Sequence, residues 1–272
     1  MTILSNPARI VSFTSSEIYK LLSIGSRLMT DEELAENKRL NPKSKKTTIA
    51  DGFGDLALTY IAEKNMARRL GRSLTTETNA RPTTWGKCLE PFAYRKLGFD
   101  YELVSDVTIQ HPDIPYWCGS PDVTKVTGLN GDWTVGDIKC PQTLKSFCQL
   151  VDGIYTKSWD DNGSALIERI RTNHPSGEQY YQQLVSNAIL TGSDYAELII
   201  YVPYRDDLDE IRLTASDNKA FKWIEYADDY ELPWLIEGGY YQDLNIIRFE
   251  VPQSDKELLT NAVIEAGKLL QI

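Results

Sequence analysis

The chain has 272 residues, of which 42% are hydrophobic and 25% charged, a balance that is ordinary for a globular protein with a sizeable core. No run approaches the ~18 apolar residues of a membrane span, and Met1 to Ile10 lack an apolar signal-peptide core, so we expect neither membrane insertion nor secretion. The four cysteines form no C-x-x-C pair, which favours free thiols in a reduced cytosol over disulfides, zinc or an iron–sulfur cluster.

The net charge of −10 is unfavourable for a nucleic-acid-binding protein, which usually carries a basic surface. The charge is uneven, because the acidic excess falls largely in the second half of the chain. The segment from Asn37 to Arg72 has more basic than acidic residues. Its acidic residues are Asp51, Asp55 and Glu63. Its basic residues are Lys38, Arg39, Lys43, Lys45, Lys46, Lys64, Arg68, Arg69 and Arg72. This segment can bind phosphates, although a solvated charged face explains any single lysine equally well.

Three helices are predicted before residue 100. The hydroxyls of Thr14-Ser15-Ser16 can cap a helix that runs through Leu22. A longer helix is predicted from Asp51 to Leu70 and is ended by Gly71. A third helix is predicted from Pro82 to Leu97.

Strand patterns follow at Glu102 to Ile109, Trp117 to Val126 and Trp133 to Cys140. The turn residues Gly128-Leu129-Asn130-Gly131 predict a hairpin between the last two.

The rest of the chain alternates helices with strands and contains no repeat or linker. Helices are predicted at Thr143–Val151, Ala165–Arg171, Glu178–Leu190 and Asp255–Leu270, and strands at Tyr195–Val202, Glu210–Leu213 and Asn245–Val251. The order from Pro82 to Val202 predicts an α/β core.

Three acid-x-Lys triplets occur, and only the one at Asp137-Ile138-Lys139 lies in an apolar strand. The triplet that begins at Glu36 lies in a charged run, and the one that begins at Asp217 lies in a polar turn. Both are expected to be exposed to solvent. Strand alternation places Asp137 and Lys139 on one face and Ile138 on the other. The alternative is a buried structural ion pair.

Asp122, in Gly119-Ser120-Pro121-Asp122, is predicted on the strand beside Asp137. Clustered carboxylates repel one another unless a cation joins them, and oxygen ligands favour Mg²⁺, for which Mn²⁺ can substitute. Lys139 would orient or deprotonate a water and screen transition-state charge, and Gln183 could hold the lysine or the water. Glu90 shares a helix face with apolar residues, so it is either a further ligand or a solvated edge residue.

These residues together resemble the lambda-type phage exonucleases (YqaJ-like viral recombinases) of the PD-(D/E)xK nuclease superfamily. Four blocks match in order over roughly Arg9 to Arg205. The first is Arg9 with Thr14-Ser15-Ser16-Glu17, and the second is Trp85-Gly86-Lys87 with Glu90. The third is Ser120-Pro121-Asp122 with Asp137 to Pro141, and the fourth is Tyr180 to Thr191, which includes Gln183. The resemblance implies an α/β fold with a restriction-endonuclease-like core, in which helices flank a central mixed β-sheet, with N- and C-terminal elaborations. We expect one nuclease domain over 1–272, with its core at about 82–205, a helical DNA-end-binding part at 1–81 and a C-terminal elaboration at 206–272.

The resemblance also implies an activity, which is Mg²⁺-dependent 5′-to-3′ digestion of one strand of duplex DNA. By position, Glu90, Asp122, Asp137 and the Ile138 carbonyl resemble the metal ligands, and Lys139 and Gln183 the catalytic lysine and glutamine, with Glu90 also counted among the catalytic residues. Arg9, Ser16 and Ser120 fall where the family binds the terminal 5′-phosphate, and an arginine with hydroxyls near a helix start suits an anion. A ring-shaped homotrimer, a single-strand annealing partner and the cytoplasm of a bacterium or phage-infected host are implied too.

The chain departs from the family pattern in several places. Asp137 stands where many members have Glu, Val123 replaces a glycine, and Thr83 falls where the phage lambda enzyme has an apolar wedge. Two other functions therefore stay open, which are a structure- or site-specific DNA endonuclease of the same fold and a non-catalytic DNA-binding recombination module.

Overall fold

The structure is a computed structural model that describes residues 7–74, 79–127, 132–156 and 162–271. Its centre is a five-stranded mixed sheet in the order β10-β9-β8-β7-β4. Only β8 and β9 run parallel, and the other neighbours are antiparallel. The strands are β4 Tyr101–Leu103, β7 Val123–Thr127, β8 Asp132–Lys139, β9 Tyr195–Tyr201 and β10 Leu244–Glu250.

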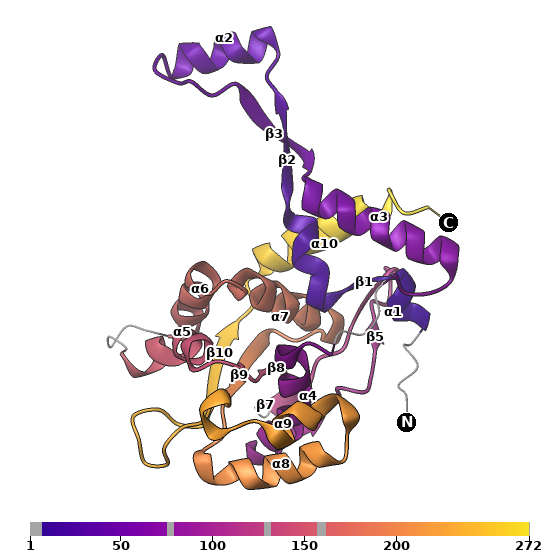
Figure 1. Cartoon of the computed structure of the whole chain (residues 1–272). Helices are drawn as coiled ribbons and strands as arrows, with labels where there is room; N and C mark the ends of the chain where they lie inside the picture. Colours follow the sequence, from indigo (N-terminus) through magenta and orange to yellow (C-terminus); the bar gives the residue numbers. More distant parts are fainter. Residues whose placement is uncertain (1–6, 75–78, 128–131, 157–161, 272) are drawn as a thin grey trace.

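Helices cover both faces of this sheet, so the predicted α/β fold with a flanked mixed sheet is confirmed (Figure 1). Side chains of β9 alternate between two apolar clusters, since Leu198 and Ile200 join one and Ile199 and Tyr201 the other. The first cluster includes α5 Leu144–Tyr155, α6 Gly163–Asn173, α7 Gly177–Thr191 and α10 Gln253–Gly267. The second includes α4 Arg81–Lys96, α8 Leu208–Ser216 and α9 Lys222–Tyr226.

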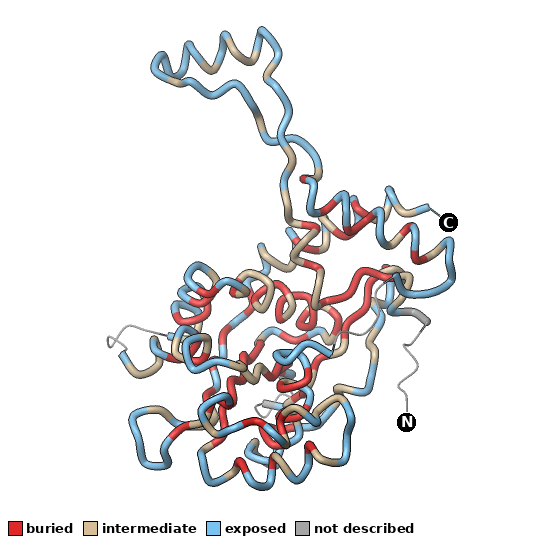
Figure 2. Tube along the Cα trace, in the orientation of Figure 1, coloured by how far each residue is buried: buried red, intermediate tan, exposed pale blue. Residues whose placement is uncertain are grey.

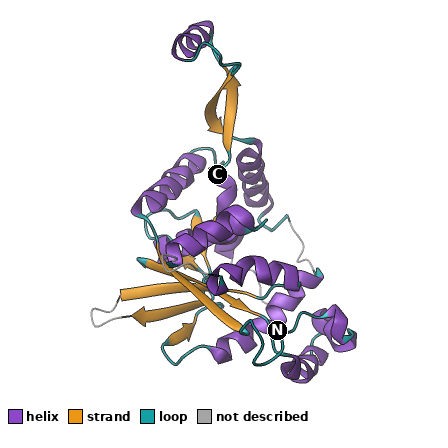
Figure 3. Cartoon of the chain, turned by 90° about the vertical axis from the view of Figure 1, so that its left-hand side faces the viewer, coloured by secondary structure: helices purple, strands orange, loops and turns teal. Residues whose placement is uncertain are grey.

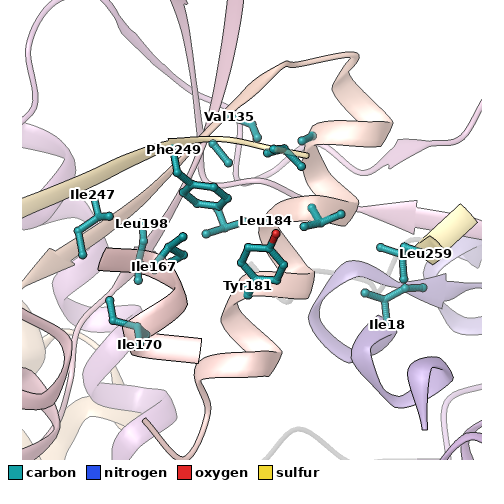
Figure 4. Packing of buried hydrophobic residues seen from close by; sticks show 14 of the residues in the cluster. Ile18, Val135, Ile167, Ile170, Tyr181, Leu184, Leu198, Ile247, Phe249 and Leu259 are labelled. Carbon is teal, nitrogen blue, oxygen red and sulfur yellow. The ribbon is translucent and has the colours of Figure 1, made fainter. Parts of the chain in front are cut away.

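Both ends of the chain enter the first cluster (Figure 4). Leu259 of α10 is fully buried and packs in the same cluster as Ile18 of the 3₁₀ helix η1, Ser15–Leu22. Farther along, Tyr181 of α7 stacks on Phe249 of β10, with ring centroids 5.7 Å apart. The C-terminal segment, which no motif assigned, therefore supplies an edge strand and a covering helix of the core.

A small second sheet joins the N-terminal segment to the middle of the chain. Its strands are β1 Phe13–Thr14, β6 Trp117–Gly119 and β5 Ile109–Gln110, with β1 parallel to β6, and the helix α1 Pro7–Val11 precedes it. Gly119 is required at the end of β6, because a Cβ there would lie 2.1 Å from Ser15 Oγ and 2.6 Å from Asn187 Oδ1.

An arm stands clear of the body between η1 and α3 Asp55–Leu70 (Figures 1 and 3). It is an antiparallel ribbon of β2 Ile24–Leu28 and β3 Thr48–Phe53, tipped by α2 Asp31–Leu40. Helix α2 begins with a capping box between Thr30 and Glu33 but buries no residue. The arm is accordingly exposed or half-buried along its length (Figure 2).

Several predicted boundaries were wrong. The segment Glu210–Leu213, predicted as a strand, lies inside helix α8, because Leu208, Ile211 and Ala215 recur at helical spacing and are all buried. The predicted helix from Asp51 begins only at Asp55, because Asp51 belongs to β3. Short 3₁₀ turns complete the chain at η2 Arg205–Asp207, η3 Lys219–Phe221 and η4 Asp229–Glu231.

Two predicted strands are each divided. Glu102–Ile109 overlaps two separate strands, β4 at its start and β5 at its end, and Trp117–Val126 is broken between β6 and β7 at Ser120-Pro121-Asp122. The turn 128–131 lies outside the described residues, but β7 and β8 on either side pair antiparallel, as the hairpin requires. All four cysteines (Cys88, Cys118, Cys140 and Cys148) are free thiols, as predicted. In the described residues, no helix is long and apolar enough to cross a membrane.

Candidate active site

Asp137 and Lys139 lie at the carboxyl end of β8 on the same face of the sheet, as alternation predicts. Lys139 Nζ is 2.6 Å from Asp137 Oδ2, and this carboxylate oxygen, although buried, makes no hydrogen bond of good geometry. The Asp137 side chain is 2% exposed, and that of Lys139 is 21% exposed. Ile138 points to the opposite face, where it joins the cluster around α4. A buried carboxylate and a reachable cation thus face the same space.

Helix α7 crosses this face and contacts both charged groups. Gln183 Nε2 donates to Asp137 Oδ1 at 2.5 Å, while Gln183 Oε1 accepts from Lys139 Nζ at 3.2 Å. The predicted role of Gln183 as holder of the lysine therefore has a structural counterpart. Lys139 Nζ also lies 4.9 Å from the ring centroid of Tyr180, which precedes Gln183 by three residues and so shares its helix face.

Asp122 precedes β7 and is tied to β8 through the backbone. Its amide donates to the carbonyl of Gly136 at 3.2 Å, and its Oδ2 accepts from the amide of Ile138 at 2.6 Å. Gly136 has room for no side chain, since a Cβ there would lie 2.6 Å from Val123 Cγ2. This close pairing brings the Asp122 carboxylate beside the triplet 137–139.

Glu90 approaches from α4, whose buried residues pack on the Ile138 side of the sheet. Burial and the charge of Asp137 raise its pKa, while a hydrogen bond with Ser105 and the charge of Lys139 oppose that rise. Glu90 is therefore within electrostatic reach of the site, but it enters from the other face.

The carboxylates of Asp122, Asp137 and Glu90 repel one another. Burial raises the pKa of Asp122 well above its ordinary value, and the charges of Asp137 and Glu90 raise it further. Burial alone would lower the pKa of Lys139, but Asp137 and Asp122 raise it, so Lys139 is an ammonium at neutral pH. Burial likewise raises the pKa of the neighbouring thiol of Cys140.

These donors fit a hard divalent cation. Two features would be satisfied by such an ion. They are the repulsion between the carboxylates and the buried Asp137 oxygen, which meets Lys139 Nζ without a hydrogen bond of good geometry. Among the residues that the structure describes, however, no three Asp, Glu, His or Cys side chains gather closely enough to hold an ion. Asp122 and Asp137 are carboxylates that the structure brings together, and all four residues, with Glu90 and the Ile138 carbonyl, stay predicted ligands.

The residues predicted to bind a 5′-phosphate lie around the small sheet. Ser16 follows β1 and Ser120 follows β6, and because Thr14 pairs with Cys118 in parallel, both serines leave the sheet at the same end. Both are half-buried, and Ser16 Oγ lies 3.5 Å from Thr14 Oγ1. Arg9 is exposed on α1, which packs on β6.

The basic segment 37–72 does not form one surface. Its first part lies on the arm, where Lys43, Lys45 and Lys46 are exposed. Its second part lies on α3, where Lys64 is half-buried 5.3 Å from the Tyr60 ring centroid and Arg68 Nε donates to the Val11 carbonyl. Only the arm therefore presents a run of exposed lysines.

Two site residues were missed from the sequence, Tyr180 and Gln179. Gln179 Nε2 donates to the backbone carbonyl of Ser16 at 3.1 Å. The spacing of Gln179, Tyr180 and Gln183 along one helix could have indicated both, but only after Gln183 had been placed against Lys139. Thr83, at the position of the expected wedge, is exposed near the start of α4.

Comparison with known proteins yields matches in structure only, because no protein-family model and no curated protein sequence matches the chain. The alkaline exonuclease LHK-Exo from Laribacter hongkongensis superposes with a TM-score of 0.52 at 16% identity, over 96% of this chain and 89% of that one. The structure of LHK-Exo in complex with dAMP superposes with a TM-score of 0.53 at 16% identity, over 97% of this chain and 90% of that one.

A phage-related exonuclease from Haemophilus somnus 129PT superposes with a TM-score of 0.54 at 13% identity, over 95% of this chain and 93% of that one. The chain thus has the fold of these exonucleases over nearly its whole length. The predicted resemblance to phage exonucleases is confirmed at the level of the fold.

Proposed function

We propose that the protein is a metal-dependent 5′-to-3′ exonuclease that degrades one strand of linear double-stranded DNA in phage-type homologous recombination. One observation carries the proposal, which is the convergence of Asp122, Asp137, Lys139 and Gln183 at the carboxyl end of the central strand β8. Structural binding modules need no buried carboxylates beside a reachable ammonium, whereas phosphodiester hydrolysis needs such groups. The shared exonuclease fold supports the same conclusion.

The residues divide the work of hydrolysis. Lys139, held as an ammonium by Asp137 and Gln183, stabilises negative charge that develops on the phosphate and orients the attacking water. Asp122 and Asp137, with Glu90 and the Ile138 carbonyl, would hold Mg²⁺ or Mn²⁺. When bound, such an ion lowers the pKa of a water and stabilises the leaving oxygen.

The substrate is proposed to be a duplex end. Arg9, Ser16 and Ser120 would receive the terminal 5′-phosphate through a guanidinium and two hydroxyls. The exposed lysines of the arm lie in a segment without acidic residues and offer further phosphate contacts. A homotrimeric ring, a single-strand annealing partner and a site of action in the cytoplasm belong to the same proposal.

Digestion of labelled linear duplex tests the proposal. We expect degradation from a 5′-phosphorylated end in Mg²⁺, slower degradation from a 5′-hydroxyl end, none in EDTA, and no cleavage of closed circles. Cleavage of closed circles would instead establish the endonuclease of the same fold.

A further inference from the structure

Helix α7 contacts both the candidate hydrolytic residues and the segment that carries Ser16. Gln183 bonds to Asp137 and Lys139, and one turn earlier Gln179 donates to the Ser16 carbonyl. The two glutamines are four residues apart on one face, which is about 6 Å along the helix axis. A single rigid element therefore sets the distance between the two sites.

The same helix face makes a second contact with η1 beyond Gln183. Ser186 lies seven residues after Gln179, and its Oγ is 2.8 Å from Ser15 Oγ. The same oxygen accepts a hydrogen bond from Trp117 Nε1 at 2.9 Å. Ser15, Ser186 and Trp117 are all buried. Contacts to η1 thus lie on both sides of Gln183, so η1 is unable to slide along α7 without breaking one buried and one half-buried hydrogen bond.

We infer that Gln179 is a positioning residue that fixes where the strand is cut. The inference rests on the proposed function, in which Ser16 binds the terminal phosphate and Lys139 acts at the scissile phosphate. The interval between these sites decides how many nucleotides separate the end from the cut. Because Gln179 and Gln183 are held one helical turn apart on α7, loss of the Gln179 contact would let the segment with Ser16 shift relative to Lys139 and would change the length of the released product.

The test compares Gln179→Met, which keeps the length of the side chain but removes its N–H donor, with Gln149→Met at an exposed position of α5. Products from 5′-phosphorylated and 5′-hydroxyl duplexes are sized on denaturing gels. For Gln179→Met we expect dinucleotides beside mononucleotides and a 2- to 10-fold smaller preference for phosphorylated ends, about the factor that one hydrogen bond supports. Gln149→Met should match the wild type.

A second variant reaches the same contact from the other side. Ser186→Ala removes the bond to Ser15 together with the acceptor for Trp117 Nε1, and it should mix the product sizes in the same way. A Gln179→Met protein that is slower but keeps its product size and end preference overturns the inference, because Gln179 then only supports the fold. A wild type that leaves linear DNA intact in Mg²⁺ and Mn²⁺ overturns the proposed function, and the inference with it.

Discussion

Lys139 is the residue whose charge state the structure defines most directly. Its ammonium contacts Asp137, Gln183 and the face of Tyr180, and the two nearby aspartates raise its pKa above the ordinary value. Because it stays protonated, Lys139 is suited to stabilise negative charge and not to act as a base. This arrangement suits a transition state that gains negative charge on the phosphate.

Replacing Lys139 with Ala should lower the cleavage rate about 100- to 1,000-fold, the usual loss when one preorganised stabiliser is removed. DNA affinity should change little, because one charge among many phosphate contacts is lost. Single-turnover digestion and a binding assay in EDTA measure the two effects, with Lys145→Ala on the exposed side of α5 as the control. If wild type and variant are equally inert in Mg²⁺ and Mn²⁺ yet both bind DNA, the protein is the non-catalytic module.

Asp122→Asn should raise the stability of the metal-free protein at neutral pH while abolishing cleavage. The amide oxygen of Asn can still accept from the Ile138 amide, but it carries no charge to be desolvated by burial or repelled by Asp137. The further folding raises the pKa of Asp122, the more the charged form costs the folded state, so the variant should resist unfolding better at neutral pH. Thermal or denaturant unfolding in EDTA measures it.

The pH dependence of this gain has a defined sign. Because folding raises the pKa of Asp122, the folded wild type binds more protons than the unfolded chain, and its stability falls as pH rises from the ordinary pKa of Asp through the folded value. The variant should lose its advantage below the ordinary pKa, where Asp122 is protonated in both states. Mg²⁺ should raise the unfolding midpoint of the wild type more than that of the variant. A gain that is independent of pH would contradict the charge-repulsion account.

At the scale of elements, the sequence predicted those helices and strands in which polar and apolar side chains alternate with a clear period. Strand β8 alternates, so Asp137 and Lys139 could be assigned to one face, and they share that face in the structure. In contrast, Glu210–Leu213 is too short to distinguish a strand from one face of a helix, and burial of Leu208 and Ala215 decides for the helix. The ribbon of the arm was missed because Gly25, Ser26 and Gly52 interrupt any alternation.

The arm should be separable from the fold of the body. Ile24 and Phe53 pair directly at its base, so residues 25–52 can be replaced with an Asn-Gly turn that closes the ribbon. Helix α2 buries nothing, and the free energy of unfolding should therefore change by less than about 1 kcal/mol. Denaturant unfolding of the shortened protein measures this change.

Removal of α10, residues 253–267, is the matched control deletion. It exposes the cluster that Leu259, Val263 and Ala266 cover, and it should unfold or strongly destabilise the body. An arm deletion that destabilises the protein as much as the α10 deletion would mean that the arm supports the core.

At the scale of the whole molecule, the core is closed by contacts that sequence patterns do not report. Phe13 and Ile18 near one end share a cluster with Leu259 near the other, and Glu90 reaches the site from the opposite side of the sheet to Gln183. Periodicity assigns a face to each residue, but it does not say which distant element covers that face. The site could therefore be assembled from its motifs, whereas the C-terminal contribution to the fold could not.

The charge distribution of the whole molecule leads to a last prediction. The whole chain has a net charge of −10, which disfavours DNA binding, yet residues 37–50 contain basic residues and no acid, and Lys43, Lys45 and Lys46 are exposed on the arm. Duplex binding should therefore weaken with salt in proportion to the phosphates that these lysines contact. The slope of log affinity against log salt should decrease by about 0.9 for each contact removed, so the triple alanine variant should lose up to about 3.

Anisotropy titrations of labelled duplex in EDTA, at several salt concentrations, measure the slopes. Lys219→Ala, an exposed lysine in the acidic second half, is the control and should leave the slope unchanged. Parallel slopes for the wild type and the triple variant would show that the duplex does not reach the arm. If the triple variant instead changes only the sedimenting mass, the arm contacts a second copy of the chain, and the phosphates must be bound by the residues around Arg9 and Ser16 alone.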